Sequence, residues 1–134
     1  MTELREQIYS IVNAVSAVAD NVFYDTAQET GEGSDTTYPY LVFTFLTSPR
    51  QRKDTGSNER IAKIQFDLYG ESGLDTIADE LESDLDDTAN YSFTEYSIMN
   101  MFEDFRVGPF QIERDASSPL WQLSFQYTYS LIEV

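Results

Sequence analysis

Apolar and polar residues alternate along residues 59–69, a period of two that is typical of a β-strand with one buried face. Gly70 ends the alternation. Along residues 74–85 the apolar positions instead recur at steps of three and four, which predicts an amphipathic helix. Ser72, with Asp75 three residues later, is the predicted N-cap. We therefore expect a strand that turns into a helix lying back over the strand's apolar face.

The longest alternation lies at residues 120–132 and predicts a long strand whose aromatic face belongs to the core. A helical stripe predicts a first helix over residues 2–19, capped by Thr2. Shorter segments complete the pattern, with strands expected at residues 21–25, 40–47 and 96–102 and polar loops at 26–37 and 49–58. The strand at 40–47 is apolar on both faces, so we expect it to be buried on both sides.

Residues 103–118 show no sustained period and are predicted to be irregular. Gly108-Pro109 is a turn signal within this segment. Phe110 and Ile112 are expected to form at most a short extension of the sheet.

These elements predict an α+β fold in which an antiparallel sheet carries two helices packed on one face. The length of 134 residues predicts a single domain, residues 1–134. The second face of the sheet is expected to be polar but poor in charge, which suits either water or a subunit interface. It carries Lys63, Gln65, Asp67, Gln122, Ser124, Gln126 and Thr128.

The formal net charge of −16 argues against direct binding to nucleic acid, which needs clustered basic residues. Many carboxylates and few lysines also resemble the composition of proteins from extreme halophiles. An ordinary acidic protein or a mimic of DNA remains an alternative explanation of the same composition.

The basic residues are concentrated in one predicted hairpin. Arg50, Arg52 and Lys53 fall within four residues, and Arg60 and Lys63 follow in the next strand. One interpretation is a solvated hairpin tip. The other is a candidate subunit or partner interface formed by these five residues, because concentrated positive charge in an acidic chain favours one orientation of contact.

The sequence contains no histidine and no cysteine, which removes the common nucleophilic triads and the commonest metal ligands. We identify no catalytic, cofactor-binding or metal-binding residues, and we expect no enzymatic activity. Residues 84–95 partly match a calcium-binding loop, but Ala89 stands where the sharp turn of such a loop needs glycine. The apolar run at residues 40–46 is too short to span a bilayer, so no membrane partner is expected.

Several segments together carry a family resemblance. They are the amphipathic first helix, Tyr38-Pro39-Tyr40-Leu41-Val42-Phe43, the run at 61–70 with Gln65-Phe66-Asp67-Leu68-Tyr69, the helix with Leu74, Ile77, Ala78 and Leu81, and the final aromatic strand. In their order, over nearly the whole chain, they resemble the tail-completion or tail-terminator proteins of long-tailed, siphovirus-like bacteriophages and archaeal viruses. The stronger acidity and the loosely fitting segment 103–119 depart from that pattern.

The resemblance implies a non-enzymatic virion protein that forms a ring, typically a hexamer, at the head-proximal end of the tail tube. Such a ring ends tube polymerisation and joins the tail to the head connector. The implied partners are further copies of the chain, the tail tube protein and the head–tail connector protein, with DNA passing through the lumen without specific binding. The implied location is the virion tail, after assembly in the host cytoplasm.

Three other functions are compatible with the same residues. The chain could be a different connector component, such as a head-closure or adaptor protein. It could be an acidic DNA mimic that occupies a nucleic-acid-binding protein, or a calcium-dependent binding module that uses residues 84–95.

Overall fold

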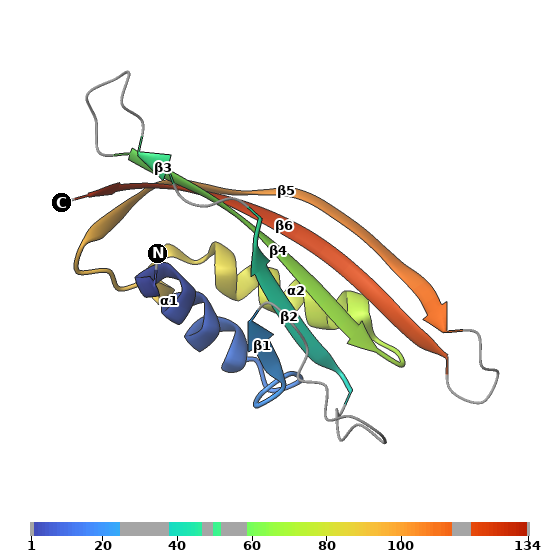
Figure 1. Ribbon diagram of the computed structural model, residues 1–134. Helices are drawn as coiled ribbons and strands as arrows, with labels where there is room; N and C mark the ends of the chain where they lie inside the picture. Colours follow the sequence, from blue (N-terminus) through green and yellow to red (C-terminus); the bar gives the residue numbers. More distant parts are fainter. Residues whose placement is uncertain (1, 25–37, 47–49, 52–58, 114–118, 134) are drawn as a thin grey trace.

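The computed structural model describes residues 2–24, 38–46, 50–51, 59–113 and 119–133. Over these residues, helices α1 (Thr2–Asn13) and α2 (Leu74–Asp86) pack on one face of a six-stranded sheet (Figure 1). The strands are β1 (Val22–Tyr24), β2 (Tyr40–Phe45), β3 (Arg50–Gln51), β4 (Glu59–Gly70), β5 (Tyr96–Glu113) and β6 (Leu120–Glu133), and a short 3-10 helix, η1 (Thr88–Asn90), follows α2. The predicted α+β fold is confirmed.

The strand order is β1-β2-β4-β6-β5, with β3 paired to β4 beside the end of β2. All pairs are antiparallel except β1 with β2. In this register Phe43, Phe66 and Phe125 lie side by side across β2, β4 and β6. Their rings stack, with centroids 6.0 Å apart for the first pair and 4.8 Å for the second.

The core lies between the sheet and the two helices. Its centre combines the alternate residues Ala62, Ile64, Phe66 and Leu68 of β4, all fully buried, with the predicted inner faces of α2 and β6. Trp121 is only partly buried at the end of β6. Three tyrosine hydroxyl groups form hydrogen bonds at the edge of this core. The hydroxyl oxygens of Tyr129 and Tyr91 lie 2.7 Å apart, and the Tyr127 hydroxyl donates to Asp86 Oδ1 at 2.8 Å.

The first helix is shorter than predicted. It ends at Asn13 instead of continuing to residue 19. Beyond it, the amides of Val15 and Val18 bond to carbonyls three residues back, and the Asn13 side chain accepts a bond from the Asp20 amide at 2.8 Å. Val15 and Val18 are nevertheless buried. Their helix-like spacing in the sequence therefore arises because successive turns, and not a helix, place them in the core.

The start of the second helix also differs from prediction. Gly73 occupies the N-cap position with φ +71°, and it makes no side-chain cap. Ser72 therefore lies one residue too early to cap the helix.

The largest correction concerns residues 103–113, which continue β5 as a strand of 18 residues. Gly108-Pro109 lies inside this strand instead of forming a turn between elements. The register between β5 and β6 shifts at four places. Each irregularity interrupts the period of two, which is why the sequence pattern predicted an irregular segment.

Candidate assembly interface

Neither helix covers the second face of the sheet, and residue pairing shows which side chains occupy it. Paired residues of an antiparallel sheet point to the same face. The polar residues of β6 point away from the helices, because they alternate with the buried Leu123, Phe125, Tyr127 and Tyr129. Their partners on β5 are Phe102 for Thr128, Phe105 for Gln126, Val107 for Ser124 and Phe110 for Gln122.

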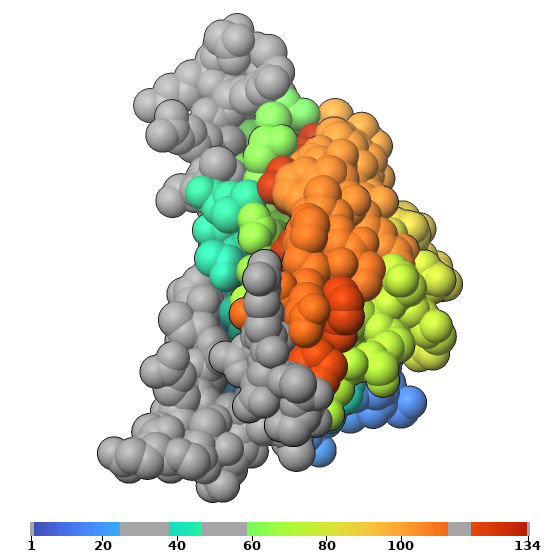
Figure 2. All heavy atoms as spheres, turned by 90° about the vertical axis from the view of Figure 1, so that its right-hand side faces the viewer, coloured from blue at the N-terminus to red at the C-terminus, as the bar shows by residue number. Residues whose placement is uncertain are grey.

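These four apolar residues, Phe102, Phe105, Val107 and Phe110, form the β5 stripe. Their exposed fractions are 45, 39, 42 and 54%. Strand β5 is an outer strand of the sheet, and Figure 2 shows it as a broad surface with no described element over it. An exposed apolar row on an outer strand is typical of a surface that contacts another molecule.

The polar residues beside the stripe bind one another. Asp67 Oδ1 accepts a hydrogen bond from Ser124 Oγ at 2.6 Å and a longer one from Gln122. Although no helix covers them, Ser124 and Thr128 are only 8% and 5% exposed. The network therefore presents a closed surface in which the polar groups are satisfied.

Asp104, in a bulge of β5, joins the same face. Its Oδ2 accepts hydrogen bonds of 2.6 Å from both Thr128 Oγ1 and Gln126 Nε2, and Lys63 Nζ lies 3.7 Å away. Burial raises the pKa of Asp104, but the hydrogen bonds from Thr128 and Gln126 and the charge of Lys63 outweigh it and hold the pKa below its usual value.

The middle of this face is therefore poor in net charge. Among its described side chains, Lys63, Asp67 and Asp104 carry charge, and each has a partner within the face. The chain as a whole has a formal net charge of −16. The acidic groups thus lie mainly elsewhere, for example along α2.

Three further exposed apolar side chains lie near the opposite edge of the sheet but do not share one surface. Tyr38 and Leu46 lie beyond the two ends of β2. Tyr24 on β1 points to the helix side, because it pairs with the buried Phe43 and its ring centroid lies 4.9 Å from the Arg5 guanidinium of α1. Tyr38 lies against Tyr40, whose ring stacks on that of Tyr69 at 4.8 Å. Tyr38 is therefore supported by rings of β2 and β4.

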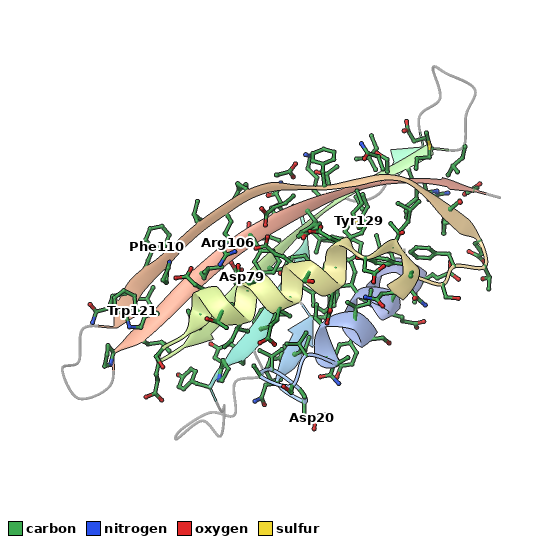
Figure 3. The ribbon with its side chains drawn as sticks, turned by 180° about the vertical axis from the view of Figure 1, so that it is seen from behind. Asp20, Asp79, Arg106, Phe110, Trp121 and Tyr129 are labelled. Atoms are coloured by element: carbon green, nitrogen blue, oxygen red, sulfur yellow. The ribbon has the colours of Figure 1, made fainter. Side chains whose placement is uncertain are left out.

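The helix-facing side of β5 is held to α2 by Arg106. Its guanidinium lies 2.7 Å from Asp79, 3.3 Å from Asp75 and 3.3 Å from Glu82. In Figure 3, Arg106 and Asp79 point toward each other, whereas Phe110 points away from α2. The arginine thereby fixes the orientation of the strand whose outer side carries the β5 stripe.

The basic residues predicted as an interface fall into two groups. Arg50 lies in β3, paired with Ile61, and Arg52 and Lys53 lie outside the described residues, as does the side chain of Arg50. Arg60 binds Glu133 at 3.0 Å and lies on the helix side of β4, opposite to Lys63. The structure therefore gives Arg60 and Lys63 ion pairs within the sheet but does not place them on one surface.

Residues 84–95 do not form a calcium loop in the structure. Asp84 and Asp86 belong to α2, and Asp87 caps η1 by accepting a bond from the Ala89 amide at 3.0 Å. Within the described ranges, no group of three or more histidine, cysteine, aspartate or glutamate residues is placed to hold a metal ion. The helices in those ranges are also too short or too polar to cross a membrane.

Sequence reasoning missed the β5 stripe and Arg106, because Arg106 and all of the stripe after Phe102 lie in the segment predicted to be irregular. A detectable signal was present: apolar residues recur at 102, 105, 107, 110 and 112. Their spacing fits a strand only when extra residues are allowed at bulges.

Comparison with known proteins gives a result for the fold. The sequence matches no protein-family model, and no curated protein matches it significantly. The structure is similar to a chain of a solved structure described as the virion of a native gene transfer agent particle. The similarity has a TM-score of 0.58 at 9% sequence identity and covers 99% of this chain and 93% of that chain. This chain therefore has, over almost its whole length, a fold that also occurs in a virion.

Proposed function

We propose that this chain is a structural virion protein that forms a ring at the head-proximal end of a tail tube. The ring ends tube polymerisation and joins the tail to the head connector. The observation that carries this proposal is the fold similarity to a virion chain, which extends over nearly all of both chains. The element order that resembles tail-terminator proteins supports the same assignment.

The surface of the molecule supports a role in assembly. A ring needs two different patches on each copy, related by a rotation that closes. The β5 stripe, on an outer strand of the sheet, is an exposed apolar surface suited to one of these two contacts.

The acidic character supports the passage of DNA without binding. Tight binding of DNA depends on basic residues that neutralise phosphates and release counterions. With 24 acidic and 8 basic residues, the chain offers little such neutralisation. A lumen lined by this protein would therefore repel DNA.

We also propose that the basic segment with Arg50, Arg52 and Lys53 contacts an acidic surface of a neighbouring copy. A groove between α2 and the turns that follow α1 is a suitable surface, because Asp79, Glu80 and Asp84 line it. Arg60 and Lys63 lie on opposite sides of β4, so this proposed contact can include only one of them. Lys63, beside Asp104 on the face without helices, is the one nearer to the β5 stripe.

The test of function uses the tail tube protein of the same virus. We would polymerise that protein with and without the labelled chain and measure tube lengths by negative-stain electron microscopy. The proposal predicts shorter tubes with label at one end. Unchanged tube lengths and unlabelled ends would contradict it.

A head-closure or adaptor protein is the second candidate, because the virion similarity does not specify a position within the particle. This role predicts label on the head connector and none on the tube. The same microscopy, with isolated connectors added, separates the two candidates.

A further inference from the structure

A group of carboxyl side chains lies where α2 contacts the helix-facing side of β5. Asp75, Asp79 and Glu82 of α2 surround Arg106 of β5, and the exposed fractions of these three acidic side chains are 67, 71 and 15%. Glu103, also on β5, is hydrogen-bonded to the Glu82 side chain. Two of the helix acids therefore face water, whereas Glu82 lies between the helix and the strand.

Glu82 receives less from Arg106 than its two neighbours on α2 do. The guanidinium donates hydrogen bonds to Asp79 Oδ1 at 2.7 Å and to the carbonyl oxygen and Oδ1 of Asp75 at 3.0 and 3.3 Å. Among the described residues, Glu82 Oε2 is buried without a hydrogen-bond partner, although a guanidinium nitrogen lies 3.3 Å away. Because a buried oxygen without a donor is costly when it carries charge, this position favours the neutral form of Glu82.

The other groups around Glu82 favour the same form. A hydrogen bond between two carboxyl side chains needs a proton on one of them, and Glu103 is the partner on β5. Asp86, further along α2, adds negative charge. On β6, the Tyr127 hydroxyl donates to Asp86 Oδ1 at 2.8 Å and lies 3.4 Å from the Glu82 carbonyl oxygen, so it brings no positive charge. Within the described part of the chain, Arg106 is the cation that opposes these groups.

Ionisation of Glu82 would act directly on β5. Without the proton, the carboxylates of Glu82 and Glu103 repel each other across the contact between helix and strand, against the attraction of Arg106. Phe102 and Phe105 flank Glu103 in the sequence and lie on the outer face of the same stretch of β5. A movement of this stretch away from α2 would therefore displace the β5 stripe.

We infer that the carboxyl pair of Glu82 and Glu103 is a pH-sensitive switch between α2 and β5. The pair holds the strand against the helix while it shares a proton, and β5 opens locally when the proton is lost. Contacts made through the β5 stripe should then weaken as the pH rises. This last consequence rests on the proposed function, whereas the switch itself does not.

The pH range of the switch follows from the two states of Glu82. With β5 closed, burial, the hydrogen bond with Glu103 and the nearby negative charges raise the pKa of Glu82 to about 8, whereas an open β5 returns this pKa toward its ordinary value of 4.5. Opening therefore releases one proton between these two values. The equilibrium constant for opening should rise about tenfold for each pH unit from about pH 5 to about pH 8, and stay level above that.

Amide hydrogen exchange followed by mass spectrometry measures this opening, once each rate is divided by the intrinsic exchange rate at the same pH. Peptides from residues 100–107 of β5 should show the tenfold slope in the wild type and no slope in Glu82→Gln, whose side chain stays neutral. Peptides from β4 should exchange more slowly than those from β5 at every pH, because the opening is local. Glu80→Gln is the matched control, since it removes the same charge from α2 at a residue that lines the groove with Asp84, and it should keep the wild-type slope.

Glu103→Gln repeats the test from the strand side. It should move the upper end of the slope to lower pH, because the partner of Glu82 has lost its charge. A corrected rate for β5 that is independent of pH in the wild type, or an unchanged slope in Glu82→Gln, would overturn the inference. Equal rates in β4 and β5 would also overturn it, because they would indicate unfolding of the whole domain. The proposed function is tested separately by tube length, so its failure would leave the switch intact.

Discussion

Gly108 lies where the backbone of β5 closely approaches that of β6. Its φ is +101°, a conformation that L-residues rarely adopt. A Cβ at this position would lie 2.8 Å from the Gln122 carbonyl oxygen and 3.2 Å from Leu123 Cα. Gly73 also has a positive φ, +71°, but a Cβ there would meet nothing within 4 Å. Substitutions at the two glycines therefore allow the cost of backbone strain to be distinguished from the cost of steric overlap.

We expect Gly73→Ala to lower the free energy of unfolding by about 1 kcal/mol through strain alone. Gly108→Ala should lower it by roughly 2–4 kcal/mol, because strain and overlap with backbone atoms add. Urea denaturation measures both. Equal effects of the two substitutions would contradict the close approach of β5 to β6.

Glu82 on α2 is held in an acidic environment beneath β5. Burial, a hydrogen bond with Glu103 and the negative charges of Glu103 and Asp86 raise its pKa to about 8, against the opposing charge of Arg106. The folded protein therefore retains a proton that the unfolded chain releases near the ordinary value of 4.5. The stability gained from this proton is complete below about pH 4.5 and is lost as the pH rises through about 8.

Glu82→Gln should remove this pH dependence, because glutamine stays neutral and retains a hydrogen-bond donor. We expect the melting temperature of the variant to exceed that of the wild type by an amount that grows from pH 5 to pH 9. Thermal unfolding followed by circular dichroism over that range provides the measurement. A difference that is constant with pH would show that Glu82 is not protonated in the folded state at neutral pH.

At the scale of elements, the sequence predicted most where one face of an element is buried without interruption. The period of two in β4 and β6 and the stripe of α2 predicted these elements within one or two residues of their observed bounds. Their register is strongly specified, because a shift by one residue would expose Phe66 and Phe125 to water.

The sequence predicted less where the backbone departs from a constant period. The bulges of β5 shift Phe105 and Val107 out of the alternation that Phe102 begins, and a further bulge brings Phe110 back into it. The candidate interface was therefore not recognisable as a strand in the sequence. The end of α1 was predicted too late because the pattern there continues beyond the helix. Val15 and Val18 are buried and keep a helical spacing, although they lie in turns after Asn13.

Arg106 links α2 to β5 and offers a test at this scale. Arg106→Gln leaves Asp75 and Asp79 without their shared cation and should lower the free energy of unfolding by about 1–2 kcal/mol. Arg5→Gln removes the same charge from a guanidinium that lies 4.9 Å from the Tyr24 ring centroid, and it should cost at most about 1 kcal/mol. Chemical denaturation of both variants decides the comparison, and equal effects would argue against a specific role for Arg106.

At the scale of the whole molecule, charge and assembly are linked. A formal net charge of −16 on 134 residues creates repulsion within each copy and between copies. Salt shortens the distance over which this repulsion acts, from about 30 Å at 0.01 M to about 3 Å at 1 M. High salt also strengthens contacts between apolar surfaces.

We therefore expect the melting temperature to rise between 0.01 M and 1 M sodium chloride, as a halophilic origin also requires. Differential scanning calorimetry at fixed pH measures this dependence. A melting temperature that stays flat across the range would indicate that the acidic groups do not limit stability.

We propose that copies of this chain assemble through an apolar, charge-poor surface of the sheet into a closed ring. Sedimentation velocity of the wild-type protein in 2 M salt, over a range of protein concentrations, measures the mass of the assembly. We expect one assembled species of about six copies and no larger assemblies, as for a closed ring. A monomer at every concentration, or an open-ended series of growing assemblies, would contradict it.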